Sequence, residues 1–228
     1  MDFNKLRTLS KDTTNENMKV SQSTDMLNEF TQLITFLVED FRKLSVKESA
    51  LFIMSLVNWF KRKDNSCYKD KKTGKSIKPK VGEIYLADLG IAYKPEMGYT
   101  HPVIIIGIVG NSLLVVPTTT SKEKLQQAYH PISNPEGKRY LRKVDKIDGF
   151  ATTCTILLRK GNTISIGRLL EYKGKVKDEN LINEVVNKSF EQMYPRIYRK
   201  QQGIEIENIE LNAKINILQE EIEVLKKN

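Results

Sequence analysis

The stretch from Val81 to Ser121 constrains the fold of this chain more than any other part of its sequence: VGEIYLADLGIAYKPEMGYTHPVIIIGIVGNSLLVVPTTTS. Residues 83–89 and 102–109 have the composition of strands, and the second segment is almost wholly apolar. Gly110-Asn111-Ser112 is a turn signal, after which an apolar strand resumes at 113–116. The short connection between the last two strands predicts an antiparallel hairpin.

Further strand signals follow up to about residue 176 and predict an α+β protein built on a small β-barrel. Residues 156–158 and 163–166 flank Arg159-Lys160-Gly161-Asn162, which predicts a second hairpin with a basic tip. A long loop that contains prolines separates the two halves. Short strands joined by hairpins are typical of small barrels.

The junction between the polar loop and the apolar strand carries the first candidate site. His101, one of two histidines, stands at the entrance to this strand, and the next strand ends on Thr118, Thr119, Thr120 and Ser121. A titratable group beside hydroxyls is how a small barrel would build an active site. Two plainer interpretations stay open: the histidine is a structural hydrogen-bonding group, and the threonines are ordinary strand residues.

The N-terminal part of the chain predicts helices and loose connections. Residues 1–22 are polar and indicate a disordered tail. Apolar residues at three- and four-residue spacing, with a capping-box sequence from Ser45 to Glu48, predict a helical hairpin over residues 23–62. The apolar faces of this hairpin either pack within the protein or form a partner-binding groove. Residues 63–79 are rich in lysine and indicate a basic linker, which is either simply solvated or grips nucleic acid.

The C-terminal part predicts two helical segments. A helix from Asp178 ends the barrel region, which covers residues 80–194, and Pro195 is expected to interrupt it. Residues 203–228 follow a heptad and predict a two-stranded parallel coiled coil, with an amphipathic helix that folds back on its own protein as the alternative. Its d positions are Ile204, Leu211, Leu218 and Leu225, and its a positions are Asn208, Ile215 and Ile222.

Charge and cysteine content narrow the partners and the compartment. The net charge of +9 and the pI near 9.3 favour nucleic acid or an acidic protein as partner, unless they reflect only a lysine-rich surface. Cys67 and Cys154 lack metal-ligand spacing, which indicates a reducing compartment and no metal site. No apolar run resembles a signal peptide or a membrane span, so we expect a cytoplasmic protein with no membrane contact.

Three sequence blocks, GEIYLADL, PEMGYTHPVIII and VVPTTTS, resemble successive blocks of the MazF/PemK family of toxin endoribonucleases, in the same order and at nearly the same spacing. A weaker fourth block, TILLRKGNTISIGRL, resembles the family's final strands. The resemblance covers about residues 80–194. It implies an SH3-like barrel of the MazF/PemK/CcdB kind that forms a homodimer, with the N-terminal helical hairpin and the C-terminal helices as additions.

The resemblance also implies a function: a toxin of a type II toxin–antitoxin system that cleaves single-stranded RNA, including mRNA. The 2′-OH attacks the adjacent phosphate and leaves a 2′,3′-cyclic phosphate, without a metal or other cofactor. The implied partners are RNA, a cognate acidic antitoxin, and DNA through a toxin–antitoxin complex.

The implied catalytic residues are His101, Thr119 and Glu96. His101 stands where the family has its catalytic arginine. An imidazole transfers protons near neutral pH but lacks a permanent charge, so the substitution predicts either cleavage with a changed pH dependence or a weakened enzyme. The expected RNA-binding residues are Arg142, Lys143, Arg159, Lys160, Arg168, Thr118, Thr120 and Ser121.

Each expected contact also has a structural interpretation. In this interpretation Arg159 and Lys160 are solvated charges at a hairpin tip. Arg168 is then a residue of a structural salt bridge, and Glu96 caps its own loop. Two other functions therefore stay open. One is a catalytically weak or inactive nucleic-acid-binding or regulatory member of the same fold, and the other is an assembly protein dominated by its helices.

Overall fold

The structure is a computed structural model that describes residues 2–70 and 73–227. The chain divides into two compact units, one up to Met54 and one from Ser55 onward. Helix α3 (Val46–Arg62) spans this division, so each half of α3 is described with its own unit.

The N-terminal unit consists of helices. It contains α1 (Phe3–Lys11), two 3-10 turns, η1 (Thr13–Asn15) and η2 (Val20–Gln22), then α2 (Thr24–Phe41) and the first half of α3. The expected disordered tail at residues 1–22 thus holds one helix and two turns. The capping box is present: the Glu48 amide donates to Ser45 Oγ at 3.2 Å, and the Ser45 amide donates to the Glu48 carboxylate at 3.2 Å.

The second unit is built on one mixed sheet with the strand order β10-β3-β4-β5-β8-β7-β6, and β9 pairs with β5. All pairs are antiparallel except β6 with β7. The bounds are β3 (Glu83–Asp88), β4 (Thr100–Val109), β5 (Ser112–Thr119), β6 (Ala128–Tyr129), β7 (Lys138–Val144), β8 (Cys154–Leu157), β9 (Asn162–Ser165) and β10 (Leu169–Lys175). The α+β class is therefore confirmed.

One sequence prediction about this sheet is confirmed and two are wrong. The predicted β4–β5 hairpin is present, with Val109 paired to Ser112. The predicted second hairpin is not seen, because β8 and β9 pair with successive parts of β5 instead of with each other. The strand pairing of the described residues also does not close into a barrel. The strands β7 and β6 follow β8 at one edge of the sheet, and β10 is the last strand at the other edge, beside β3.

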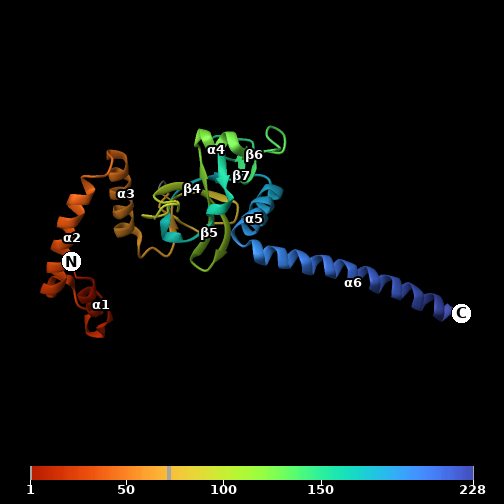
Figure 1. Cartoon of the computed structure of the whole chain (residues 1–228), viewed down its shortest axis with the longest axis horizontal. Coiled ribbons are helices and arrows are strands. Elements are labelled where there is room, and N and C mark those ends of the chain that lie inside the picture. Colours follow the sequence, from red (N-terminus) through yellow and green to blue (C-terminus); the bar gives the residue numbers. More distant parts are fainter. Residues whose placement is uncertain (1, 71–72, 228) are drawn as a thin grey trace. The chain divides into compact units, whose positions relative to one another are not determined.

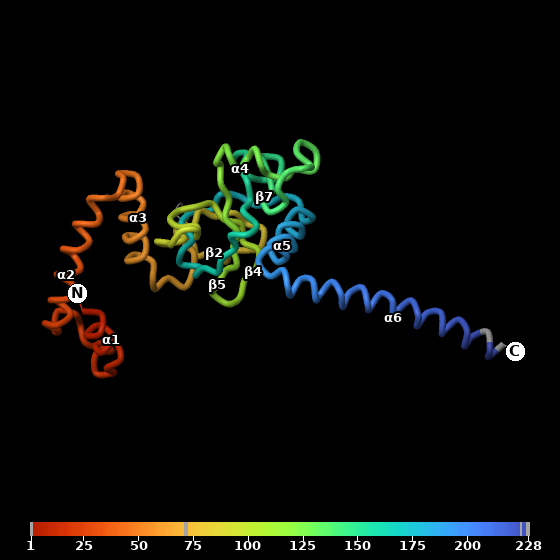
Figure 2. The backbone as a smooth tube through the Cα atoms, in the orientation of Figure 1, coloured from red at the N-terminus to blue at the C-terminus, as the bar shows by residue number. Residues whose placement is uncertain are grey.

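Apolar clusters cover both faces of the central strands, which explains why β4 is apolar at almost every position. On one face Tyr85, Val103 and Val115 belong to one cluster. On the other face Ile104 packs in a cluster with Val185 of α5 (Glu179–Met193), and Figure 1 shows this helix alongside the sheet. Figure 2 shows the chain path through β4, β5 and α5.

Residues 55–79 are part of the second unit although the resemblance does not reach them. The stretch expected as a basic linker, residues 63–79, contains β1 (Tyr68–Lys69) paired with β2 (Ser76–Ile77). Tyr68 is only 2% exposed, and its ring lies 5.0 Å from that of Tyr85. One buried aromatic residue therefore ties a lysine-rich segment to the core.

The C-terminal half of α3 lies against the end of the sheet through a close backbone contact. Arg62 Nη1 donates to the Leu169 carbonyl at 2.8 Å. A β-carbon at Gly167 would lie 2.8 Å from the Arg62 carbonyl oxygen and 2.9 Å from that of Asn65. A residue without a side chain is thus required at position 167 for α3 to approach this closely.

Helix α6 (Pro195–Lys227) is continuous through Gly203. Pro195 is its first residue, where a missing amide costs nothing, so the proline begins the helix instead of merely interrupting the previous one. The apolar heptad side chains Ile204, Leu211, Leu218 and Ile222 are exposed in the single chain. Across the described helices, none combines the length and the apolar character needed to cross a membrane.

Replacing Gly167 with alanine should destabilise the fold by about 1–3 kcal/mol, because the new methyl group overlaps two backbone carbonyl groups. Thermal unfolding followed by circular dichroism should show a lower Tm. Gly203→Ala is the matched control: its β-carbon meets nothing within 4 Å, and alanine favours a helix by about 1 kcal/mol. Equal Tm values for the two variants would contradict the close contact at Gly167.

Candidate functional site

The pairing of β3, β4 and β5 places His101 opposite a hydroxyl group. His101 pairs with Ala87 on one side, and Val103 pairs with Pro117 on the other. Extending this register by two residues places Thr119 across from His101. Directly opposed residues in an antiparallel pair present their side chains on the same face. The structure therefore brings together two of the three predicted catalytic residues.

The same row continues across the sheet. Thr119 pairs with Thr155 of β8, and Thr155 pairs with Lys143 of β7. His101, Thr119, Thr155 and Lys143 thus form a cross-strand row on one face of the sheet. Thr155 is 0% exposed, and within the described part of the chain its Oγ1 has no hydrogen-bond partner. Sequence reasoning missed Thr155, because a threonine at a strand start carries no signal of its own.

The His101 imidazole is half-buried at the edge of the core. Burial lowers its pKa below the usual value of 6.5, and backbone hydrogen bonds to Thr118 and Gly98 oppose this shift. The imidazole is consequently neutral at pH 7. A neutral imidazole can accept a proton but cannot replace the permanent charge of an arginine.

The four hydroxyl residues at the end of β5 have different environments. Thr118 is buried, and its hydroxyl donates to the Pro102 carbonyl at 3.3 Å. Thr119 Oγ1 accepts from the Ser121 amide at 3.3 Å. Thr120 and Ser121 are exposed, and α4 (Lys122–Gln127) follows them. Thr119 is therefore the hydroxyl of this group in the His101 row, whereas Thr118 has a role inside the sheet.

Glu96 lies on the exposed loop between β3 and β4. Its carboxylate accepts from the Tyr93 amide at 3.3 Å, which is a local turn contact. Two residues further on, Gly98 forms the backbone hydrogen bond to His101. Met97 packs against the apolar clusters on the same face. The loop that carries Glu96 is thus anchored beside His101, and Glu96 itself faces solvent.

Arg142 is committed to contacts inside the protein. Its Nε lies 3.0 Å from the Glu184 carboxylate, its Nη1 donates to the Lys143 carbonyl at 2.8 Å, and its guanidinium lies 5.7 Å from the centre of the Tyr129 ring. These contacts join β7 to α5. Arg142 is therefore not available to contact RNA, and Lys143 is the residue of β7 that we expect to do so.

The basic residues between β8 and β9 form the 3-10 turn η3 (Leu158–Lys160). Lys160 Nζ donates to the Pro95 carbonyl at 2.7 Å, which places η3 against the β3–β4 loop. Arg159 is exposed, donates to Gln192 at 2.8 Å and lies 4.0 Å from the centre of the Tyr140 ring. Two of the predicted RNA-binding residues are thus grouped beside the loop that carries Glu96.

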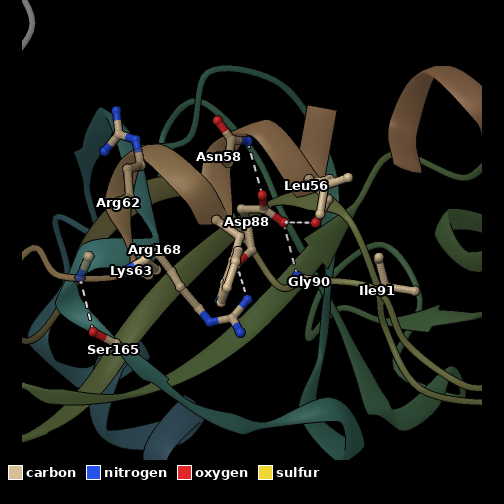
Figure 3. A pocket seen from close by; sticks show the side chains of 12 residues that line it. Leu56, Asn58, Arg62, Lys63, Asp88, Gly90, Ile91, Ser165 and Arg168 are labelled. Atoms are coloured by element: carbon tan, nitrogen blue, oxygen red, sulfur yellow. Dashed lines mark hydrogen bonds between the residues drawn. The ribbon is translucent and has the colours of Figure 1, made fainter. Parts of the chain in front are cut away.

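Arg168 belongs to another part of the second unit. It lies in the 3-10 turn η4 (Ile166–Arg168), and its Nη1 donates to the Asp88 backbone carbonyl at 3.0 Å (Figure 3). Asp88 pairs with Thr100, so its side chain lies on the opposite face of the sheet from that of the adjacent His101 row. Arg168 is thus bound to the backbone at the end of β3.

Within residues 2–70 and 73–227, no group of three or more histidine, cysteine, aspartate or glutamate side chains is placed to hold a metal ion. Both cysteines are free thiols. Burial raises the pKa of the Cys154 thiol to about 11, so this thiol is protonated at neutral pH.

Comparison with known proteins gives the class of this domain. Residues 80–190 match the family described as "PemK-like, MazF-like toxin of type II toxin-antitoxin system". Residues 80–190, which hold the strands β3 to β10 and most of α5, thus match this toxin family as a domain. A comparison with curated proteins finds no match.

Solved structures with similarity to this chain include an endoribonuclease and a toxin. One is an "Endoribonuclease in complex with its cognate antitoxin from Mycobacterial species", with 17% identity, a TM-score of 0.37, and coverage of 52% of this chain and 97% of that chain. Another is the "Mycobacterium tuberculosis toxin MazF-mt6", with 17% identity, a TM-score of 0.33, and coverage of 48% of this chain and 96% of that chain.

The pKa of His101 should lie below 6.5 in the folded protein, because burial disfavours its charged form. An NMR titration of the imidazole C–H signals measures it, and a His130→Gln variant assigns the two histidines. Since the folded state resists protonation, the free energy of unfolding should fall as the pH drops from about 6.5 through the folded pKa. A His101 pKa at or above 6.5 would contradict the buried environment.

Proposed function

We propose that the PemK/MazF-family domain is an endoribonuclease that cleaves single-stranded RNA without a metal ion, as the toxin of a type II toxin–antitoxin pair. The observation that carries the proposal is the cross-strand row: a neutral imidazole, a hydroxyl and a lysine on one face of the sheet. Family membership supports the same class of activity. A substrate of the mRNA class would place this activity in the cytoplasm.

In the proposed reaction His101 accepts the proton of the ribose 2′-OH, and the 2′-oxygen attacks the adjacent phosphorus. The bond from phosphorus to the 5′-oxygen breaks, and the products are a 2′,3′-cyclic phosphate and a 5′-hydroxyl that takes up a proton. Lys143 and the Thr119 hydroxyl stabilise the charge that develops on the phosphorane. Glu96 is the second candidate for proton transfer, since it lies on the loop that is anchored beside His101 and its carboxylate is exposed to solvent.

The RNA would cross the row and continue over exposed polar groups beside it. Arg159 and Lys160 are grouped next to the β3–β4 loop, and Thr120 and Ser121 are exposed at the end of β5. Cationic side chains there would pair with phosphates and release counterions. The net charge of +9 also suits a cognate acidic antitoxin, through which a toxin–antitoxin complex would contact DNA.

A second candidate function has a specific observation in its favour. The His101 imidazole is hydrogen-bonded to the backbone of Thr118 and of Gly98, and such a histidine can simply hold the loop against the sheet. In that case the domain would bind or regulate nucleic acid without cleaving it. The two candidates differ in whether a proton-transfer group is needed at position 101.

Purified protein should cleave a mixed-sequence single-stranded RNA in the presence of EDTA and leave 2′,3′-cyclic phosphate ends, which end-group analysis of the fragments detects. Because His101 must be neutral to act as the base, kcat/KM should fall on the acid side, with a midpoint below 6.5 that follows the folded pKa. RNA that stays intact from pH 5 to 9 at high protein concentration would contradict the catalytic proposal.

The matched variant is His101→Asn, which keeps a hydrogen-bonding side chain but cannot transfer a proton at this pH. It should fold normally and lose at least about 100-fold in activity, the usual contribution of a positioned acid–base group. His101→Arg should restore a family-like site, and its kcat/KM should not fall at acid pH. Full activity in His101→Asn would assign the histidine a purely structural role.

We propose a homodimer in which a parallel coiled coil of α6 reinforces contacts between the family domains. The heptad side chains of α6 are exposed in the single chain, as an unpaired seam would be. Only about three heptads are present, so the seam alone is marginal and the domains would supply much of the association. A single two-fold axis can serve both contacts.

Leu218→Lys should weaken dimerisation, because it places two like charges in the seam. Light scattering over a dilution series measures the effect, and truncation after Lys200 should act in the same direction. The control is Ile217→Lys, the same change one residue away at an outward position, which should leave association unchanged. If Leu218→Lys and the truncation both dimerise normally, the heptad is not a seam between copies.

A further inference from the structure

A cleft of about 380 Å³ lies between the C-terminal half of α3, the segment after β3 and the turn η4. Its volume is in the range of small-molecule sites, about 300–1,000 Å³. Figure 3 shows Asn58 and Arg168 reaching toward Asp88, whereas the guanidinium of Arg62 points away from this group. The residues that matter for its chemistry are Ser55, Asn58, Trp59, Arg62, Asp88 and Arg168.

Asp88 organises the cleft but is not available to a ligand. It is 4% exposed, and its carboxylate accepts three hydrogen bonds, each of 2.9 Å. The donors are the Ser55 hydroxyl, the Asn58 amide group and the Gly90 backbone N–H, as the dashed lines in Figure 3 show. The one carboxylate of the cleft is therefore consumed in holding α3 to the end of β3.

Arg168 lines the cleft, and its guanidinium carries more donors than the one that it uses among the described residues. Its Nη1 donates to the Asp88 carbonyl, and a β-carbon at Gly90 would lie only 2.8 Å from that nitrogen. Gly90 has a φ of +87°, a backbone conformation that favours glycine at this position. Among the described residues, no carboxylate forms an ion pair with Arg168 or with Arg62.

The cleft also contains an aromatic ring. Trp59 is the chain's only tryptophan, it lines the cleft, and it is 52% exposed. Arg62 uses its Nη1 on the Leu169 carbonyl and keeps further donors. Flat indole and guanidinium groups next to unpaired positive charge are the features with which proteins hold unstacked nucleotides, the base on the ring and the phosphate on the cation.

We propose that this cleft binds one nucleotide of a single-stranded RNA, with the phosphate on Arg168 and the base against Trp59. An acidic peptide would satisfy Arg168 but would leave the indole face without a flat partner, so the nucleotide fits better. That the polymer is RNA rests on the proposed function. The site itself joins the family domain to α3, which lies outside the family match at residues 80–190.

The test uses the full-length protein and the fluorescence of its single tryptophan. A mixed-sequence 2′-O-methyl RNA oligomer, which cannot undergo attack by its 2′-oxygen, should quench Trp59 in a saturable manner. Arg168→Ala should raise the Kd about tenfold and lower the salt dependence by about one counterion. The control Arg196→Ala, an exposed arginine of α6, should leave both unchanged. Circular dichroism melting shows whether each variant is folded.

A second variant keeps the test valid if Arg168→Ala unfolds. Trp59→Ala removes an exposed side chain, and anisotropy of a labelled oligomer should show about tenfold weaker binding from the lost stacking. Binding equal to the unaltered protein would overturn the proposal. Stronger quenching by polyglutamate than by the oligomer would also overturn it, in favour of a protein ligand.

The two proposals fail separately. Quenching by the oligomer in a protein that does not cleave RNA supports the nucleotide site and removes only the catalytic function. Cleavage of RNA by a protein whose tryptophan does not respond to saturating oligomer supports catalysis and overturns the nucleotide site.

Discussion

The antiparallel pairing of β4 with β5 is the interaction on which the rest of the second unit depends. Both strands are apolar on both faces, so their position between two clusters is fixed by burial. A slip of one residue would turn every side chain to the other face. The pairing therefore also fixes which residues of the neighbouring strands meet: it sets Thr119 across from His101 and, through β8, sets Thr155 and Lys143 in the same row.

The end of β3 next to the His101 row contacts α3. Asp88 follows Ala87 in β3, and its side chain meets Ser55 and Asn58 of α3. Its carboxylate is satisfied by three donors, which offsets the cost of burying it. The loop that follows Asp88 then returns to His101 through Gly98. One loop thus connects the proposed catalytic row with the cleft beneath α3.

The sequence was informative where its pattern reflected burial. The β4–β5 hairpin and α5 follow from apolar runs and from three- and four-residue spacing, and the family resemblance at residues 80–190 was confirmed. The barrel closure and the β8–β9 hairpin were wrong, because the strand signals do not say that β5 shares one edge between two partners. A hairpin prediction pairs strands that are neighbours in sequence, whereas in this sheet β8 and β9 both pair with the earlier strand β5.

Other features depend on single residues that carry no pattern. Tyr68 stands alone in a lysine-rich segment, and nothing before or after it predicts that it enters the core. Arg142 and Lys143 are adjacent basic residues, yet strand alternation directs one toward Glu184 and the other toward the row. Their difference follows from the register, which charge composition does not contain.

The replacement of the family's arginine by His101 has a consequence for how charge is distributed at the proposed site. An arginine would combine a permanent charge with hydrogen-bond donors at one position. A half-buried histidine with a lowered pKa is neutral at pH 7 and brings no charge to an RNA phosphate. The charge must then come from a second residue, and Lys143 is the cation of the same row, three strands away on β7. Proton transfer and phosphate binding would therefore be divided between β4 and β7, whose relative position is fixed by the registers of β4 with β5, β5 with β8 and β8 with β7.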